Sequence, residues 1–154
     1  MTRLATLVAS FGGIGFLRPA PGSWGSGAAV ALGVPILYWG GAGALLLAAA
    51  LAYFIGSWAA SVWLAQNDSD DDPQSIVIDE VAGQWLCLAA ALPVWPWVLA
   101  AFLLFRLFDI WKPWPVRWVE QRLTGAPAIM LDDILAAGLA AAIILLARAY
   151  LGAL

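Results

Sequence analysis

Between Ser26 and Leu64 the chain carries no charged side chain, and this long uncharged stretch restricts the possible folds more than any other feature. It consists of two apolar runs, the first ending at Trp39 and the second following a glycine-rich turn. A helix that crosses the hydrocarbon core of a bilayer needs about 20 apolar residues. The two runs therefore predict a helical hairpin in a membrane, with abundant Ala and Gly that let helices approach closely.

Composition extends this prediction to the whole chain. Of its 154 residues, 64% are hydrophobic and only 11% are charged, whereas about a quarter would be charged in a soluble domain. We therefore predict an all-α, polytopic integral membrane protein that forms a single domain over residues 1–154. About five spans are expected, the last three covering roughly residues 79–92, 97–112 and 132–151.

Several classes of function can be set aside from the residues that the chain lacks. No basic patch suggests nucleic-acid binding. The absence of histidine excludes phosphohistidine chemistry, histidine general acid–base catalysis and histidine metal ligation. The single cysteine, Cys87, lies in an apolar run and is expected to be a small core residue. Any chemistry must therefore use carboxylates, lysine, arginine or hydroxyl groups.

Three charged residues follow one another at a spacing of three where the fourth predicted span ends. Arg106, Asp109 and Lys112 would share one face of a helix, and Pro113 and Pro115 would stop that helix just beyond them. Ionisable groups at membrane depth are costly, so such a row indicates a functional site. The alternative is a structural ion pair with a lysine that extends to the interface.

Two acidic pairs open predicted spans and are enclosed by aliphatic residues. Asp79-Glu80 begins the third span, and Asp132-Asp133 begins the fifth. One such pair could merely favour a helix N-terminus electrostatically, but carboxylates among apolar neighbours require compensation by a cation. The aspartates of the hydrophilic loop before the first pair are expected only to be solvated, and these are Asp68, Asp70 and Asp71.

A segment rich in glycine and proline, residues 11–26, precedes the first apolar run and is predicted to be a loop or broken segment. Its glycines would let backbone amides approach a phosphate, and Arg18 lies among them. Ser23 would cap the next helix and present its hydroxyl there. The alternative reading of this segment is a tight packing loop.

Charge asymmetry predicts which side of the membrane the motifs face. With five spans, the N-terminal segment and the 65–79 and 111–131 loops share one side, which carries most of the basic residues and is therefore cytoplasmic. All the polar motifs then meet at that face. The basic residues on this side are Arg3, Arg18, Lys112, Arg117 and Arg122, against Arg148 near the other side.

A carboxylate-rich site without His or Cys suits a hard cation such as Mg²⁺. A metal combined with Lys and Arg indicates a phosphate group as the ligand, because the cations offset its negative charge. The substrate would be a lipid whose phosphorylated headgroup lies at the interface.

Four ordered motifs carry a resemblance to a known family. They are GFLRPAPGSWGS at 15–26, DPQSIVIDEVAG at 72–83, FRLFDIWKPWP at 105–115 and IMLDDILA at 129–136. Through them nearly the whole chain resembles phosphatidylglycerophosphatase A, a bacterial membrane enzyme that converts phosphatidylglycerophosphate to phosphatidylglycerol. Ser23 stands where the family commonly has threonine, which preserves a hydroxyl, and the segment at 125–128 is less glycine-rich than usual.

The resemblance implies a phosphoric monoester hydrolase of phospholipid biosynthesis in the bacterial cytoplasmic (inner) membrane, with its site on the cytoplasmic side. It also implies Mg²⁺ dependence. Together with the residue pattern, it predicts substrate binding by Arg18, Ser23, Arg106 and Lys112. The predicted catalytic residues are Lys112 and the five carboxylates that would hold the metal, which are Asp79, Glu80, Asp109, Asp132 and Asp133.

Other readings of the same residues remain open at this stage. Another Mg²⁺-dependent enzyme of lipid phosphoryl transfer would place aspartates at the same interface, although the longer aspartate pattern of CDP-alcohol phosphotransferases is missing. A cation channel or carrier could use the carboxylates as an ion path. The absence of carboxylates midway along the spans argues against a channel.

Overall fold

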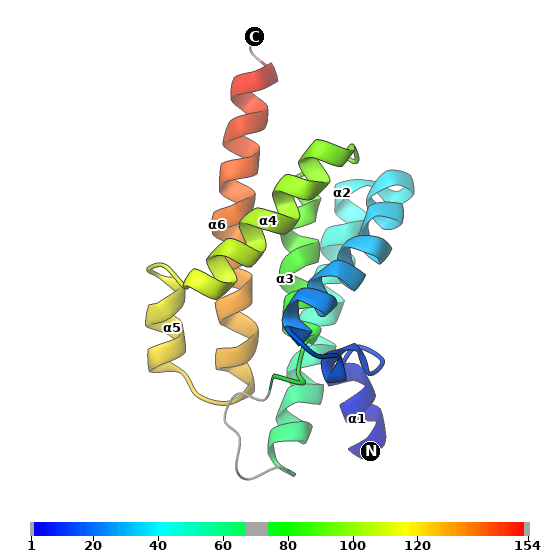
Figure 1. Cartoon of the computed structure of the whole chain (residues 1–154), viewed down its shortest axis with the longest axis vertical. Coiled ribbons are helices and arrows are strands. Elements are labelled where there is room, and N and C mark those ends of the chain that lie inside the picture. The colour runs from blue at the N-terminus through cyan, green and yellow to red at the C-terminus, as the bar shows by residue number, and fades with distance from the viewer. Residues whose placement is uncertain (1, 67–73, 153–154) are drawn as a thin grey trace.

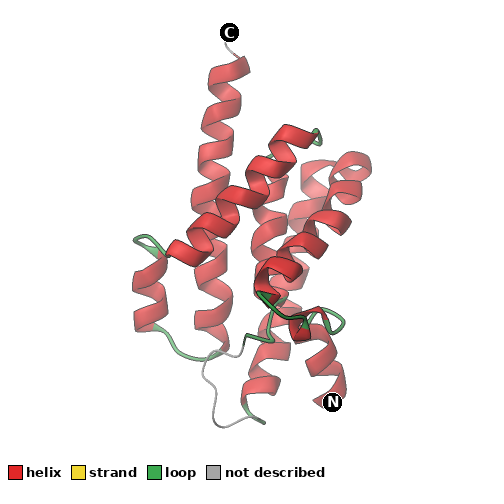
Figure 2. Cartoon of the chain, in the orientation of Figure 1, coloured by secondary structure: helices red, strands yellow, loops and turns green. Residues whose placement is uncertain are grey.

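The computed structural model describes residues 2–66 and 74–152, and in that part of the chain every regular element is a helix (Figures 1 and 2). The predicted all-α class is confirmed. Asp68, Asp70 and Asp71 lie outside the described residues. The elements are α1 (Thr2–Ala9), the short 3₁₀ helix η1 (Ile14–Phe16), α2 (Pro21–Leu64), α3 (Ile78–Ala89), α4 (Trp95–Trp111), α5 (Val116–Arg122) and α6 (Ala126–Gly152).

The α2 segment consists of two helical arms that meet at Gly41. This residue has φ 71° and ψ −179°, a conformation that glycine adopts without the steric cost of a Cβ atom. The chain reverses direction between the two arms, which are the blue and cyan helices of Figure 1. The arrangement corresponds to the helical hairpin predicted from the glycine-rich turn.

In the described part of the chain, two helical elements have the length and apolar composition needed to cross a membrane, namely the two-armed α2 and α6. Helix α3 has 12 residues and α4 has 17, which at 1.5 Å per residue give lengths of roughly 18 and 26 Å. Both are shorter than the ~30 Å hydrocarbon core of a bilayer. The predicted count of about five spans is therefore not confirmed.

The interior and the outer surface of the bundle are both apolar. Helix α3 packs mainly on α2 and α6, and the indole N–H of Trp85 on α3 donates to the Ala29 carbonyl of α2 at 2.8 Å. On the outside, Trp39, Phe54 and Leu146 are each at least 70% exposed. Soluble monomers rarely expose apolar surface so extensively, whereas lipid would cover it without cost.

Two helix boundaries near the predicted site differ from expectation. Helix α2 begins at Pro21, not near Ser26, because proline fixes the φ angle that the first helical residue needs. Ser23 thus lies inside the first turn and does not cap the helix. Helix α4 does end before Pro113, as predicted.

The polar segment after α4 contains the short helix α5, which packs against α6. Its Val116 and Val119 are buried, while Arg117, Trp118 and Glu120 are exposed. This spacing of apolar residues gives the helix one face toward the bundle. Figure 1 shows α5 beside the lower half of α6, toward the end of the molecule opposite the C-terminus.

Candidate active site

A pocket of about 670 Å³ opens where α3, α4 and α6 converge with the first turn of α2 and with α5. Six carboxylates and two cations line it. Seven of the residues predicted from sequence are brought together here from three helices and from the end of α4. They are Asp79, Glu80, Arg106, Asp109, Lys112, Asp132 and Asp133.

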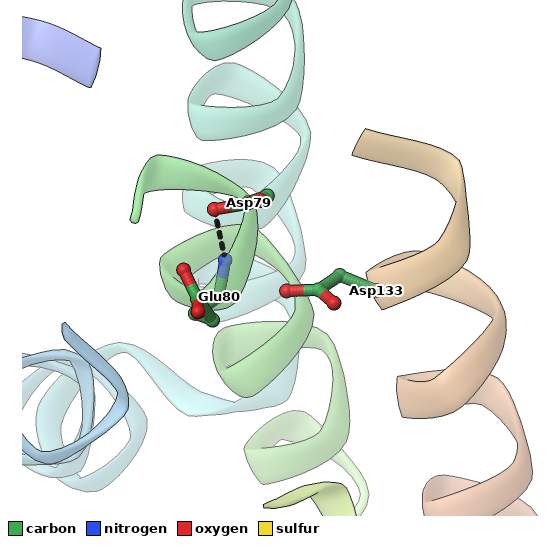
Figure 3. Close-up of side chains that lie close together, drawn as sticks. All are labelled: Asp79, Glu80 and Asp133. Atoms are coloured by element: carbon green, nitrogen blue, oxygen red, sulfur yellow. Dashed lines mark hydrogen bonds between the residues drawn. The ribbon is translucent and has the colours of Figure 1, made fainter. Parts of the chain in front are cut away.

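The innermost part of the pocket contains three carboxylates, those of Asp79, Glu80 and Asp133. One oxygen from each lies within 4.8 Å of the others, and the Asp133 side chain extends from α6 toward the pair on α3 (Figure 3). The Glu80 backbone N–H donates to Asp79 Oδ1 at 2.9 Å, which fixes one oxygen of Asp79. Within the described chain, Glu80 Oε2 and Asp133 Oδ2 are buried without a hydrogen-bond partner.

The cation nearest this trio is Arg106 on α4. Its guanidinium forms an ion pair with Asp109 one turn later and approaches Glu80 Oε1 at 3.6 Å. Its Nη1 also donates to Ser26 Oγ at 3.4 Å. The Arg106 guanidinium group therefore offsets the negative charge of one carboxylate on α3 and one on α4, and its ion pair with Asp109 fixes its position.

Lys112 does not share a helix face with Arg106 and Asp109, so this part of the predicted stripe is wrong. It follows the last residue of α4 as a left-handed C-cap with φ 48° and ψ 61°, and its backbone N–H donates to the Phe108 carbonyl. Its Nζ lies 2.9 Å from Asp132 Oδ2 and 2.7 Å from Glu120 Oε1. The chain therefore turns at Lys112 and directs the ammonium group toward α5 and α6.

The electrostatic setting of Lys112 keeps it charged. Partial burial acts to lower the pKa of the ammonium group, but hydrogen bonds and Coulomb attraction from Glu120 and Asp132 outweigh burial and raise the pKa above its usual value. The Lys112 ammonium group is therefore charged at neutral pH.

Gly22, in the first turn of α2, lets that helix approach the site closely. A Cβ atom at this position would lie 2.0 Å from Glu80 Oε1 and 3.1 Å from Nη1 of Arg106. Any larger residue would displace the Glu80 carboxylate. The Gly-rich motif therefore serves the site by packing against Glu80.

Two predicted substrate-binding residues are not among those that line the pocket. Arg18 is exposed and donates to Gln74 Oε1 at 2.6 Å, and Gln74 does line the pocket. Ser23 is half-buried in the first turn of α2. Arg18 is therefore connected to the pocket lining by its hydrogen bond to Gln74, whereas Ser23 is not part of the lining.

Sequence reasoning missed two polar residues of this region. Glu120 lines the pocket and contacts Lys112, and no sequence signal predicted this contact, because it depends on the packing of α5 against α6. Gln84 is fully buried, and neither polar atom of its amide has a hydrogen-bond partner in the described part of the chain. It lies one helical turn after Glu80, which places both side chains on one face of α3.

The residues present fit a divalent metal ion. One oxygen from each of three carboxylates on two helices lies within 4.8 Å of the others, two further oxygens of the group are buried without a partner in the described chain, and all the donors are oxygens. Hard cations such as Mg²⁺ prefer this donor set. Two cations, Arg106 and Lys112, stand beside it and would attract an anionic group.

A helical bundle with apolar outer faces and an acidic, cation-flanked pocket defines a class of protein suited to binding a metal and a phosphate group. Comparison with known proteins gives the family. The phosphatidylglycerophosphatase A family matches residues 7–148. This chain belongs to that family, so the resemblance found in its motifs is confirmed, and with it the expected class of enzyme, a phosphoric monoester hydrolase.

Curated relatives agree with the family. A Haemophilus influenzae protein named phosphatidylglycerophosphatase A is 43% identical over 130 residues, which cover 81% of this chain and 77% of the relative. The Escherichia coli protein of that name is 44% identical over 89 residues, 54% of this chain and 51% of the relative. A Bacteroides thetaiotaomicron protein, provisionally named a phosphatidylinositol-3-phosphatase, is 36% identical over 156 residues, covering 97% and 96%. No solved structure matches significantly.

Proposed function

We propose that this protein hydrolyses the terminal phosphate monoester of phosphatidylglycerophosphate, releasing phosphatidylglycerol and inorganic phosphate. The observation that carries the proposal is the pocket in which three clustered carboxylates face two cations. Membership of the phosphatidylglycerophosphatase A family supports the choice of substrate. A channel or carrier is disfavoured, because the carboxylates gather in one pocket and do not follow a path through the bundle.

In this proposal the pocket holds Mg²⁺. Of the five carboxylates predicted as ligands, we assign Asp79, Glu80 and Asp133 as the direct ligands, because one oxygen of each lies within 4.8 Å of the others. Asp109 and Asp132 are each paired with a cation, and we assign them to holding Arg106 and Lys112 beside the metal. When bound, Mg²⁺ would polarise the phosphoryl oxygens and make a water molecule a better nucleophile.

The cations of the chain receive and orient the phosphoryl group. Lys112 stands between α5 and α6 at the pocket lining, and Arg106 stands across the trio of carboxylates on α4. A lysine ammonium group and an arginine guanidinium group can each donate several hydrogen bonds to phosphate oxygens. Arg18 can contact the rest of the headgroup from beside the lining residue Gln74, to which it donates, whereas Ser23 lies outside the pocket lining and is assigned no contact.

The chemistry of the chain favours a single displacement by water at phosphorus. The sequence contains no histidine, and Cys87 is fully buried with its thiol directed to the Ala101 carbonyl at 3.4 Å. A covalent intermediate would need one of the pocket carboxylates as nucleophile, and these are better used with the metal. Turnover of a chiral phosphate ester in isotopic water should invert the configuration at phosphorus, whereas retention would indicate a phosphoaspartate.

We place the pocket at the cytoplasmic face of the bacterial inner membrane. In the five-span topology expected from the sequence, most basic residues lie on the same side of the membrane as the pocket, including Arg3, Arg18, Arg117 and Arg122. Arg148, by contrast, donates to the Ala90 carbonyl, just beyond the end of α3 that is distant from Asp79. The charge bias along the bundle therefore supports a cytoplasmic pocket.

Phosphate release tests the reaction. Purified protein in detergent micelles should liberate inorganic phosphate from phosphatidylglycerophosphate with Mg²⁺ and release almost none after chelation. Phosphatidylinositol 3-phosphate and phosphatidic acid in the same micelles should be poorer substrates. Absence of release from phosphatidylglycerophosphate at saturating Mg²⁺ would refute the proposal, and faster turnover of another lipid would reassign the substrate.

Cysteine labelling tests the location of the pocket. In a Cys87→Ser background, a cysteine placed at the exposed Thr124 should resist an impermeant maleimide in intact spheroplasts and react after lysis. Labelling of Thr124→Cys in sealed cells would put the pocket on the opposite side of the membrane.

A further inference from the structure

The Lys112 ammonium group lies between two carboxylates, one on an exposed side chain and the other on a nearly buried one. Asp132 is nearly buried, with its side chain 11% exposed, and its second oxygen accepts the backbone N–H of Asp133 at 2.9 Å. The Glu120 side chain is 43% exposed, and in the described chain its carboxylate contacts only Lys112. Exposed ion pairs contribute little to stability, so Glu120 can leave Lys112 at low cost, whereas Asp132 cannot.

The charge of the pocket gives this difference a consequence. Six carboxylates face two cations in the lining, so an entering phosphate group meets an excess of negative charge. A phosphate monoester itself carries between about 1.5 and 2 negative charges at neutral pH. Movement of Glu120 into solvent would remove one negative charge from the lining and free one donor of Lys112 at the same moment.

We propose that Glu120 is a displaceable placeholder: in the free enzyme it occupies the position on Lys112 that a phosphoryl oxygen takes on binding. Asp132 keeps the ammonium group in place during the exchange. When inorganic phosphate leaves, Glu120 returns to Lys112 and competes against rebinding of the product. This assignment rests on the proposed phosphatase function for its biological meaning, but the exchange at Lys112 concerns phosphate binding and can be measured without turnover.

The probe for this proposal is inorganic phosphate. Its dissociation constant is measured by calorimetry on the purified full-length protein in detergent with Mg²⁺, and its competitive inhibition constant is measured in the phosphatase assay. In Glu120→Gln the competing carboxylate is absent, so both constants should fall by roughly two- to fivefold, the range that an exposed ion pair supports. The KM for lipid substrate should fall in the same direction.

Two controls separate the placeholder from a general change of surface charge. Gln121→Lys raises the charge of the same exposed helix by the same amount without contact to Lys112, and should leave both constants within the error of measurement. In a Lys112→Ala background, Glu120→Gln should no longer tighten phosphate binding, because the competition requires the ammonium group.

The effect of Glu120→Gln on phosphate binding decides whether Glu120 is a displaceable placeholder. If Glu120→Gln leaves phosphate binding unchanged or weakens it, with or without a lower melting temperature, Glu120 is a structural tie and the proposal is wrong. If it tightens binding equally in the Lys112→Ala background, the effect is bulk electrostatics and the proposal is also wrong. If the wild type does not hydrolyse phosphatidylglycerophosphate but the expected pattern of phosphate binding is found, the proposed function fails and the placeholder stands.

Discussion

The two acidic pairs look alike in sequence and are used differently in the structure. In both, the first aspartate accepts the backbone N–H of the second residue, at 2.9 Å in each case. Both members of the α3 pair, Asp79 and Glu80, belong to the carboxylate trio. The α6 pair is divided, because Asp133 completes the trio while Asp132 binds Lys112.

This difference arises from the elements that face each pair. The α3 pair meets α2 and α4, which offer only the Arg106 guanidinium, already held by Asp109. The α6 pair lies beside the turn after α4, where Lys112 leaves the helix. Asp109 and Asp132 hold their cations at short range, whereas Glu80 approaches Arg106 only at 3.6 Å and keeps its second oxygen without a partner in the described chain. Glu80 therefore remains available to a metal together with Asp79 and Asp133. Substitutions at the two pairs should therefore have unequal effects.

The largest effect is expected at the trio. Asp133→Asn or Asp79→Asn should lower kcat/KM by at least about a hundredfold, since loss of even an outer-shell partner of a metal costs about 10- to 100-fold. A second readout is thermal: Mg²⁺ should raise the melting temperature of the wild type in detergent and fail to raise that of Asp133→Asn.

The matched control is the neighbouring residue. Asp132→Asn should retain Mg²⁺-dependent stabilisation while losing activity more moderately, because it disturbs the lysine and not the proposed ligands. Asp70→Asn, in the hydrophilic loop outside the described residues, should keep activity within a few-fold. Equal loss of Mg²⁺ stabilisation in Asp132→Asn and Asp133→Asn would remove the distinction drawn between them.

A smaller effect is expected at Lys112. Lys112→Ala removes a cation from the phosphoryl group and leaves Asp132 unpaired, so kcat/KM should fall by on the order of tenfold to a hundredfold. Combining it with Asp132→Asn should restore part of any lost thermal stability, because the unpaired buried charge is then also removed. If Lys112→Ala unfolds at a much lower temperature but turns over normally when folded, the lysine is structural only.

The sequence predicted the members of the site better than their partnerships. Two features were enough to predict that Asp79-Glu80 and Asp132-Asp133 meet. They are the apolar residues that flank each pair and the side of the membrane on which each helix is expected to begin. Helix type followed from uncharged runs of sufficient length, and the chain reversal followed from glycines around Gly41. These features are local or depend only on the periodicity of a helix.

The partnerships depend on geometry that periodicity does not supply. Helical periodicity continued through Lys112 predicts the wrong direction for its side chain, because Lys112 has a left-handed backbone conformation at the end of α4 and its ammonium group reaches Asp132. Glu120 could not be placed without knowing that α5 folds back on α6. Tertiary packing decides such contacts.

The smallest effect is expected at the glycine beside the α3 pair. In Gly22→Ala, the new Cβ would lie 2.0 Å from Glu80 Oε1, so the Glu80 carboxylate must shift from its position beside Asp79 and Asp133. At the α6 pair, a Cβ at Gly83 would lie 3.0 Å from the Asp133 backbone carbonyl oxygen and would not meet the carboxylate first, and a Cβ at Gly125 would meet nothing within 4 Å. We expect the substitution to lower kcat/KM by about threefold to tenfold, because a flexible side chain can absorb part of the shift.

Gly27 provides the matched substitution on the same helix. A Cβ there would meet nothing within 4 Å, and replacing an exposed helical glycine with alanine stabilises a helix by up to about 1 kcal/mol. Gly27→Ala should therefore keep full activity and melt at the same temperature or slightly higher. Because only Gly22 approaches Glu80, the ratio of the two kcat/KM values measures how tightly α2 fixes the α3 pair. Equal activity in the two variants would show that Glu80 tolerates displacement, which would leave Asp79 and Asp133 as the carboxylates that define the site.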